Sequence, residues 1–150
     1  MLDQGIRLRC GDVVRALPIP RPFDLERFRV ALGRRRRRPL LLTPVRGASG
    51  GLWLATLYED HVFYPAGADT LRQLHVIARE IGHMVLGHAG GSVAPSEIAR
   101  LLLPSVDPAL LLSTVRTTYS AADEHEAETF AVLLLDYMEV GLTPATSRPR

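Results

Sequence analysis

Residues 75–88 read HVIAREIGHMVLGH, and the interpretation of the whole chain starts from this stretch. Apolar residues recur every three or four positions around it, which predicts a helix over residues 70–87 with one buried face. Arg79 and His83 are four residues apart, so their side chains leave the same face of that helix. Glu80 lies directly beside this face.

The five residues from Arg79 to His83 differ at one position from the H-E-x-x-H motif of zinc peptidases. In that motif two histidines one turn apart bind a zinc ion, and the glutamate acts as general base on the metal-bound water. Glu80 is therefore a candidate catalytic base and His83 a candidate zinc ligand. Arg79 stands where the first histidine ligand belongs, and a guanidinium offers only donors and repels a dication.

A second segment, residues 119–131, reads YSAADEHEAETFA and begins the last expected helix. Glu124 precedes the apolar Ala127 by three residues, so it lies above the buried face of that helix. A third zinc ligand from a neighbouring helix belongs at such a position. Glu124 is the candidate for it.

The two segments together resemble the ImmA/IrrE family of bacterial metallopeptidase-like proteins. Members of that family carry H-E-[IL]-G-H, often followed by L-x-H, and later E-x-[EQ]-A-x-x-[FL]-A. The resemblance covers roughly residues 22–140 and looks like an actinobacterial branch often found beside transcriptional regulators. The matching residues are Glu80 to His83, Leu86 to His88, Glu124 to Ala127, and Phe130-Ala131.

The resemblance implies a set of site residues. Its members are the base Glu80, the ligands His83 and Glu124 if a metal binds, and the accompanying Arg79, His88 and Glu126. Two surviving ligands are fewer than the three of a usual catalytic zinc site. Zinc is therefore a possible cofactor, but we expect it to bind weakly or not at all.

Two further histidines lie close enough in the sequence to be candidates for the missing ligand. His75 is eight residues before His83, roughly 12 Å along a helix, which is too far for both to bind one ion. His88 follows the expected helix end at Gly87 and could swing in toward the site. With no dication there, Glu80 and Glu124 would repel each other. We therefore expect an Arg79–Glu124 ion pair, with Glu80 as a possible third member.

The order of expected elements is helices, then a small sheet, then helices. It predicts an α+β, zincin-like domain with a short antiparallel sheet packed on the active-site helix. The expected strands are 39–45, 52–58 and 61–64, the last two as a hairpin. The expected helices are 24–32 capped by Asp24 and ended by Gly33, 70–87 capped by Thr70, 95–104, one from 108, and one from Ser120 or Asp123 to Gly141.

The 150 residues have the length of one domain, with 145–150 as an expected disordered tail. No stretch reaches the roughly 20 apolar residues of a membrane helix, and the first residues do not resemble a secretory signal. The single cysteine, Cys10, excludes an internal disulfide and a zinc site built on cysteines. These features favour a cytoplasmic protein.

Residues Arg34 to Arg38 are five consecutive arginines in a chain of net charge +2, so the rest of the chain carries −3. A basic run can contact nucleic acid, but no aromatic residues are interleaved and no helix-turn-helix pattern follows. The run is interpreted as a solvated loop, with contact to nucleic acid or an acidic partner as the alternative. No specific nucleic-acid-binding residue is predicted.

Three functions remain open, and whether the chain is an enzyme is uncertain. The resemblance favours a pseudo-metallopeptidase that acts in transcription regulation with a helix-turn-helix protein partner. The first alternative is an active zinc-dependent endopeptidase that cleaves a repressor or an antitoxin-like partner, as in toxin–antitoxin systems. The second is a nucleic-acid-associated binding module that uses the basic run.

Overall fold

The structure is a computed structural model that describes residues 2–89, 114–116 and 119–142. It is a small α+β fold, as expected from the sequence. The expected helices at 95–104 and from 108, and the expected tail at 145–150, lie outside the described residues. The helices are α1 (Leu2–Ala16), α2 (Leu25–Arg36), α3 (Thr70–Val85) and α5 (Ala121–Leu142), and the strands are β1 (Leu40–Val45), β2 (Leu52–Ala55), β3 (Asp60–Pro65) and β4 (Thr114–Arg116).

The sheet is mixed, with the strand order β1-β3-β2-β4. The expected hairpin of β2 and β3 is confirmed, and its turn is closed by the Thr56 amide donating to the Glu59 carbonyl at 2.9 Å. The expectation of a purely antiparallel sheet is wrong, because β1 pairs with β3 in parallel. The reason is that β3 is buried along most of its length and takes a partner on each side. β1, with its exposed Pro44, fits an edge.

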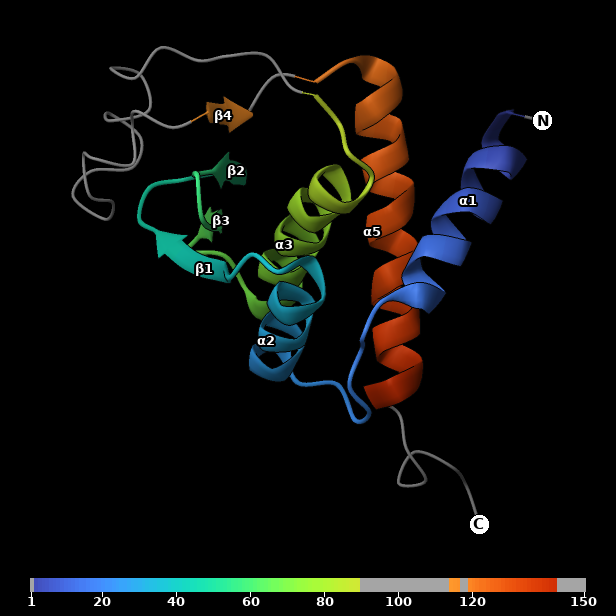
Figure 1. Cartoon of the computed structure of the whole chain (residues 1–150), viewed down its shortest axis with the longest axis horizontal. Helices are drawn as coiled ribbons and strands as arrows, with labels where there is room; N and C mark the ends of the chain where they lie inside the picture. Colours follow the sequence, from blue (N-terminus) through green and yellow to red (C-terminus); the bar gives the residue numbers. More distant parts are fainter. Residues whose placement is uncertain (1, 90–113, 117–118, 143–150) are drawn as a thin grey trace.

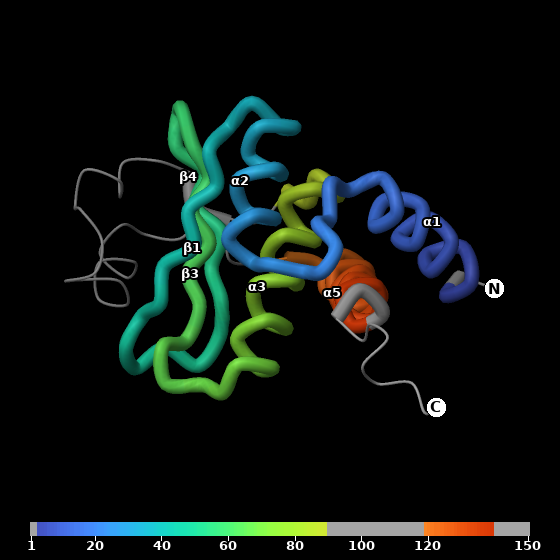
Figure 2. Tube along the Cα trace, turned by 90° about the horizontal axis from the view of Figure 1, so that it is seen from below, coloured from blue at the N-terminus to red at the C-terminus, as the bar shows by residue number. Residues whose placement is uncertain are grey.

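The elements form successive layers (Figures 1 and 2). The sheet lies on one side of α2 and α3, α5 packs against α3 on the other side, and α1 packs against the outer side of α5. Apolar side chains from each layer form one core. They include Phe28, Leu32, Val62, Ile77, Ile81, Phe130 and Leu134. None of the described helices is both long enough and apolar enough to cross a bilayer.

The helix starts follow ordinary capping chemistry. Asp24 accepts a hydrogen bond from the Arg27 amide at 2.8 Å, which confirms it as the cap of α2. Ser120 plays the same part for α5, accepting from the Asp123 amide at 3.0 Å. The cap of α3 is Asp69 rather than Thr70, because the Asp69 carboxylate accepts from the Arg72 amide. The sequence placed this start one residue late.

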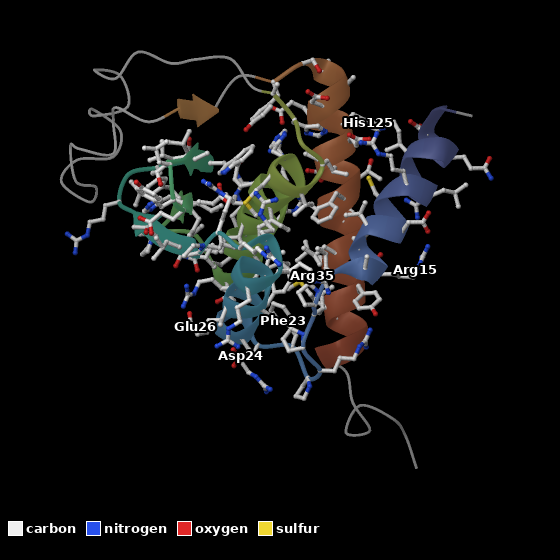
Figure 3. The ribbon with its side chains drawn as sticks, in the orientation of Figure 1. Arg15, Phe23, Asp24, Glu26, Arg35 and His125 are labelled. Atoms are coloured by element: carbon white, nitrogen blue, oxygen red, sulfur yellow. The ribbon has the colours of Figure 1, made fainter. Side chains whose placement is uncertain are left out.

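Three of the five arginines of the run lie in α2 and not in a loop, which corrects the interpretation from sequence. α2 continues through Gly33 to Arg36, and Arg37 closes it with a φ of 58°. Gly33 allows the backbone around Leu40 to pass close to α2, because a Cβ atom at residue 33 would lie 3.2 Å from the Leu40 amide nitrogen. Figure 3 shows Arg35 beside the end of α1, where its guanidinium donates to the Ala16 carbonyl at 2.8 Å.

Two arginines of the run bind a buried acid in the sheet. Arg36 and Arg38 each lie 3.2 Å from Oδ2 of Asp60, whose side chain is 1% exposed. Trp53 donates its indole N–H to Oδ1 of the same carboxylate at 3.0 Å. Arg38 also donates to the Thr56 carbonyl at 2.7 Å. Two of the five arginines therefore fasten the end of α2 and the residues after it to the β2–β3 hairpin.

The sequence does not predict α1, because its only apolar run is the short one at residues 13–17. Its apolar side is sparse, but it buries Cys10 and Val14 against the core. Near the start of α1, Asp3 binds His125 of α5 at 3.0 Å (Figure 3). The helix is thus held to α5 by a narrow apolar stripe together with polar contacts.

Candidate functional site between α3 and α5

α3 and α5 approach closely at the point where the motif residues lie. Gly82 faces Phe130 of α5, and a Cβ atom at residue 82 would come within 2.9 Å of the Phe130 ring. Real Cβ atoms essentially never come that close, so the two helices could not keep this separation with a larger residue. The glycine of the motif therefore brings Arg79 and His83 within reach of α5.

The expected ion pair between Arg79 and Glu124 is confirmed. The Arg79 Nη2 atom lies 2.6 Å from Oε1 of Glu124, and the same oxygen lies 3.1 Å from Nε2 of His83. Glu124 thus binds the residues at both positions that carry histidine in H-E-x-x-H. The guanidinium supplies, at this point between the helices, the positive charge that a metal ion would bring.

The second acid beside the guanidinium is Glu128 and not Glu80. Oε1 of Glu128 lies 3.4 Å from Nε of Arg79 and 3.0 Å from Nε2 of His75. His75, which is too far along α3 to join His83, thus anchors the other side of the arginine. The Arg79 and Glu124 side chains keep 35% and 43% of their surface exposed, so solvent screens the pair.

Glu80 is buried beside this pair and faces the start of β2. A Cβ atom at Gly51 would lie 3.1 Å from its Oε2, so the bare backbone there makes room for the carboxylate. Burial raises the pKa of Glu80 to about 7, with Arg79 lowering it and Glu124 raising it further. A carboxyl group with a pKa near neutrality can both take and give a proton, which is what acid–base chemistry requires.

His83 is almost fully buried under the ring of Tyr119. The two rings are stacked with centroids 3.6 Å apart and an angle of 8° between their planes. Burial lowers the pKa of His83 to about 4, although the Glu124 carboxylate acts in the opposite direction. The imidazole is therefore neutral at pH 7, as a metal ligand or a hydrogen-bond relay must be.

His88 turns back onto His83, as the sequence had allowed. Gly87 adopts a φ of +73°, its amide donates to the Met84 carbonyl at 3.3 Å, and the His88 amide donates to the His83 carbonyl at 3.0 Å. This pair of bonds is the Schellman ending of a helix, and glycine is favoured at the left-handed position. It brings Nδ1 of His88 to 2.9 Å from Nδ1 of His83.

Beyond His88 lies a group of three side chains that could hold a metal ion. The ligand atoms of His88, Asp123 and Glu126 all lie within 4.8 Å of one another. Nε2 of His88 is 2.6 Å from Oε1 of Glu126 and 3.6 Å from Oδ1 of Asp123. The second oxygen of Glu126 binds Arg9 of α1 at 2.7 Å.

The structure joins five of the six site residues that the sequence singled out into one network. Its order along the hydrogen bonds and ion pairs is Arg79, Glu124, His83, His88 and Glu126. The sixth, Glu80, lies beside Arg79 and Glu124, whose charges act on it.

Sequence reasoning missed four members of this network. Asp123 and Glu128 carry a weak signal, because they lie one residue before Glu124 and one turn after it. Tyr119 and Arg9 carry no such signal, since only the tertiary fold brings them near His83 and Glu126.

Comparison of the chain with models of protein families, with curated proteins and with solved structures found no match.

Proposed function

We propose that this chain is a regulatory protein of the ImmA/IrrE type, a zincin-like pseudo-metallopeptidase in which an ion pair takes the place of the catalytic zinc ion. The observation that carries this proposal is the bond of 2.6 Å between Arg79 and Glu124, at the position where the motif would hold metal. The general base and one ligand are retained in Glu80 and His83. Binding and regulation remain as uses for such a site.

The ligand chemistry of the vacated position argues against tight zinc binding there. A catalytic zinc site normally has three protein ligands, and this position offers His83 and Glu124. Both are already engaged, since the same Glu124 oxygen accepts from His83 and from Arg79. A zinc ion would have to enter beside a fixed positive charge and displace it.

A restored ligand tests this proposal. Arg79→His recreates the i, i+4 pair, and we expect the variant to bind one zinc equivalent more than the unaltered chain. Adding Glu124→Gln to it should remove that extra equivalent, since the third ligand is lost. Zinc-dependent cleavage of a protein substrate by the unaltered chain, abolished by Glu80→Gln, would contradict the pseudoenzyme proposal.

The regulatory part of the proposal has its own test, because it rests on the resemblance. The partner expected is a helix-turn-helix transcription regulator whose gene lies next to the gene for this chain. The two proteins, purified separately, should form a complex on size-exclusion chromatography, with unchanged length of the regulator after incubation. Truncation of the regulator would favour the peptidase alternative instead.

The active endopeptidase remains the second candidate, favoured by one observation. The pKa of Glu80 near 7 is the value a general base needs at neutral pH. The cleavage assay above decides between the two. The module that uses the basic run has less support, since Arg36 and Arg38 are bound to Asp60.

A further inference from the structure

Three ligand atoms converge where the end of α3 meets the start of α5, outside the vacated zincin position. They are Nε2 of His88, Oδ1 of Asp123 and Oε1 of Glu126, all within 4.8 Å of one another. The His88 and Glu126 side chains are 5% and 10% exposed, while Asp123 is one-third exposed. One nitrogen and two oxygens thus face each other in a mostly buried corner that Asp123 opens to solvent.

The spacing of these atoms is close to that of ligands around one ion. Ligand atoms about 2.0–2.2 Å from a tetrahedral metal lie roughly 3.3–3.6 Å from one another. The 3.6 Å between His88 and Asp123 already fits this geometry. The 2.6 Å between His88 and Glu126 is a hydrogen bond, and it would lengthen by roughly 1 Å when an ion replaces the shared hydrogen.

Neighbouring residues also hold the side chains of His88 and Glu126 in place, as is usual for metal ligands. A metal-bound histidine generally donates its other ring N–H to a neighbouring acceptor, which fixes the ring and its tautomer. Here Nδ1 of His88 meets Nδ1 of His83, and Nε2 of His83 meets the Glu124 carboxylate at 3.1 Å. Arg9 holds the outer oxygen of Glu126, which leaves Oε1 directed at His88.

We propose that His88, Asp123 and Glu126 form a binding site for a divalent transition-metal ion of the zinc class. One imidazole with two carboxylates suits zinc or cobalt, whereas magnesium and calcium prefer oxygen ligands alone. His83 and Glu124 act as outer support for His88 and do not touch the ion. The site lies at the turn beyond the end of α3.

This position gives the ion a structural or regulatory part rather than a hydrolytic one. The charged groups that act on Glu80 are Arg79 and Glu124, and neither belongs to the group of His88, Asp123 and Glu126. The ion would instead join the Schellman turn of α3 to the first turns of α5, where Asp123 and Glu126 lie. The inference does not depend on the proposed function, because it uses neither the resemblance nor Arg79.

The test is metal binding by the full-length chain and matched variants. Zn²⁺ is titrated against a chromophoric chelator, and Co²⁺ is followed by its visible absorption. One equivalent of each is expected to bind, and His88→Gln and Asp123→Asn should each weaken binding at least 100-fold. The controls are His61→Gln on β3 and Asp136→Asn on α5, which make the same two changes outside the network and should stay within threefold.

The variant Glu124→Gln tests whether Glu124 supports His88 indirectly or binds the ion directly. Support through His83 predicts a loss of about 10-fold, in the range usual for outer partners. If Glu124→Gln abolishes binding while Asp123→Asn leaves it intact, the ion lies in the zincin position and the proposal is wrong. It is equally wrong if the folded, unaltered chain binds neither Zn²⁺ nor Co²⁺. Should His88→Gln fail to fold, the partly exposed Asp123→Asn decides.

Discussion

Arg79 places a permanent positive charge between α3 and α5. This charge is covalently attached to α3, so it cannot dissociate from the neighbouring acids as a metal ion can. It binds Glu124 through Nη2 and lies near Glu128 through Nε, and each acid has a histidine on its other side. The result is an alternating row of donors and acceptors between α3 and α5. The charges of Arg79 and Glu124 are paired in it without any ion, although Nε of Arg79 is buried and has no hydrogen-bond partner.

Substitution of Arg79 and Glu124, singly and together, measures how much their contact contributes to the free energy of unfolding. We expect a double-mutant cycle of Arg79→Ala and Glu124→Ala to give a coupling energy of about 1 kcal/mol, measured by urea unfolding. The value is below that of a buried pair because both side chains are more than one-third exposed. The exposed Arg15–Asp12 pair is the control and should give less than about 0.5 kcal/mol. A coupling of zero between Arg79 and Glu124 would mean that the contact is incidental.

Glu80 should make the stability of the fold depend on pH. Its pKa is about 7 in the folded chain and 4.5 without the fold, so the folded state holds a proton that the unfolded state releases between these values. Stability contributed by Glu80 is therefore full below pH 4.5 and falls as the pH rises through 7, by about 3 kcal/mol in total.

The measurement is the difference between the unaltered chain and Glu80→Gln in urea unfolding at pH 5 and pH 8. Comparison with the variant is needed because His83, with its lowered pKa, acts in the opposite direction between about pH 4 and its ordinary value of 6.5. If Glu80→Gln leaves the pH dependence of stability unchanged, Glu80 is ionised in the folded chain at both pH values.

Among the elements, α2 departs most from its expected form. Gly33 followed by five arginines reads as a helix end and a solvated stretch, since glycine closes many helices and arginine is rarely buried. The tertiary fold overrides this pattern. Asp60 at the start of β3 needs partners for a buried carboxylate, and the last turn of α2 supplies them. No local signal links residues 24 positions apart.

Asp60→Ala should therefore be among the most destabilising changes in the sheet. It leaves Arg36, Arg38 and the Trp53 N–H without their shared acceptor, and we expect a loss of roughly 3–5 kcal/mol in the free energy of unfolding. The double variant Arg34→Gln and Arg37→Gln removes as much arginine charge from exposed positions. It should change stability by less than about 0.5 kcal/mol. Equal effects would restore the solvated-loop interpretation of the whole run.

At the scale of the molecule, the sequence predicted the α+β class and the contact between Arg79 and Glu124 better than the arrangement of the strands. Periodicity located α3 and α5, and the resemblance paired them, so Arg79 and Glu124 could be expected to meet. The parallel β1–β3 pair could not be foreseen, because short apolar strands carry no mark of their partner or direction. The helix α1 could not be predicted either, because its buried stripe is narrow and Gly5 and Gly11 weaken the helical pattern.

The separation of α3 from α5 sets the geometry of the whole site, and Gly82 controls it. Gly82→Ala should cost about 1–3 kcal/mol, because the added methyl group meets Phe130 in a filled core. Gly5→Ala is the matched control: it changes a helical glycine of α1 that has open space, and should stabilise the chain by about 0.5–1 kcal/mol. Opposite signs for the two changes are the expected result in thermal or urea unfolding. A stabilising Gly82→Ala would mean that the helices can move apart freely.

The turn at Gly87 has one more consequence, which concerns hydrogen exchange. The amide of His88 is bonded to the His83 carbonyl, while the ring of the same residue faces Asp123 and Glu126. Opening of the turn must therefore move the ring as well. With Zn²⁺ present at about 100 times its dissociation constant, the His88 amide should exchange about 100-fold more slowly. The Thr56 amide in the β2–β3 turn should keep its rate, unless the ion stabilises the whole molecule. The exchange rate of the His88 amide hydrogen would then measure how often the His88 ring moves away from Asp123 and Glu126.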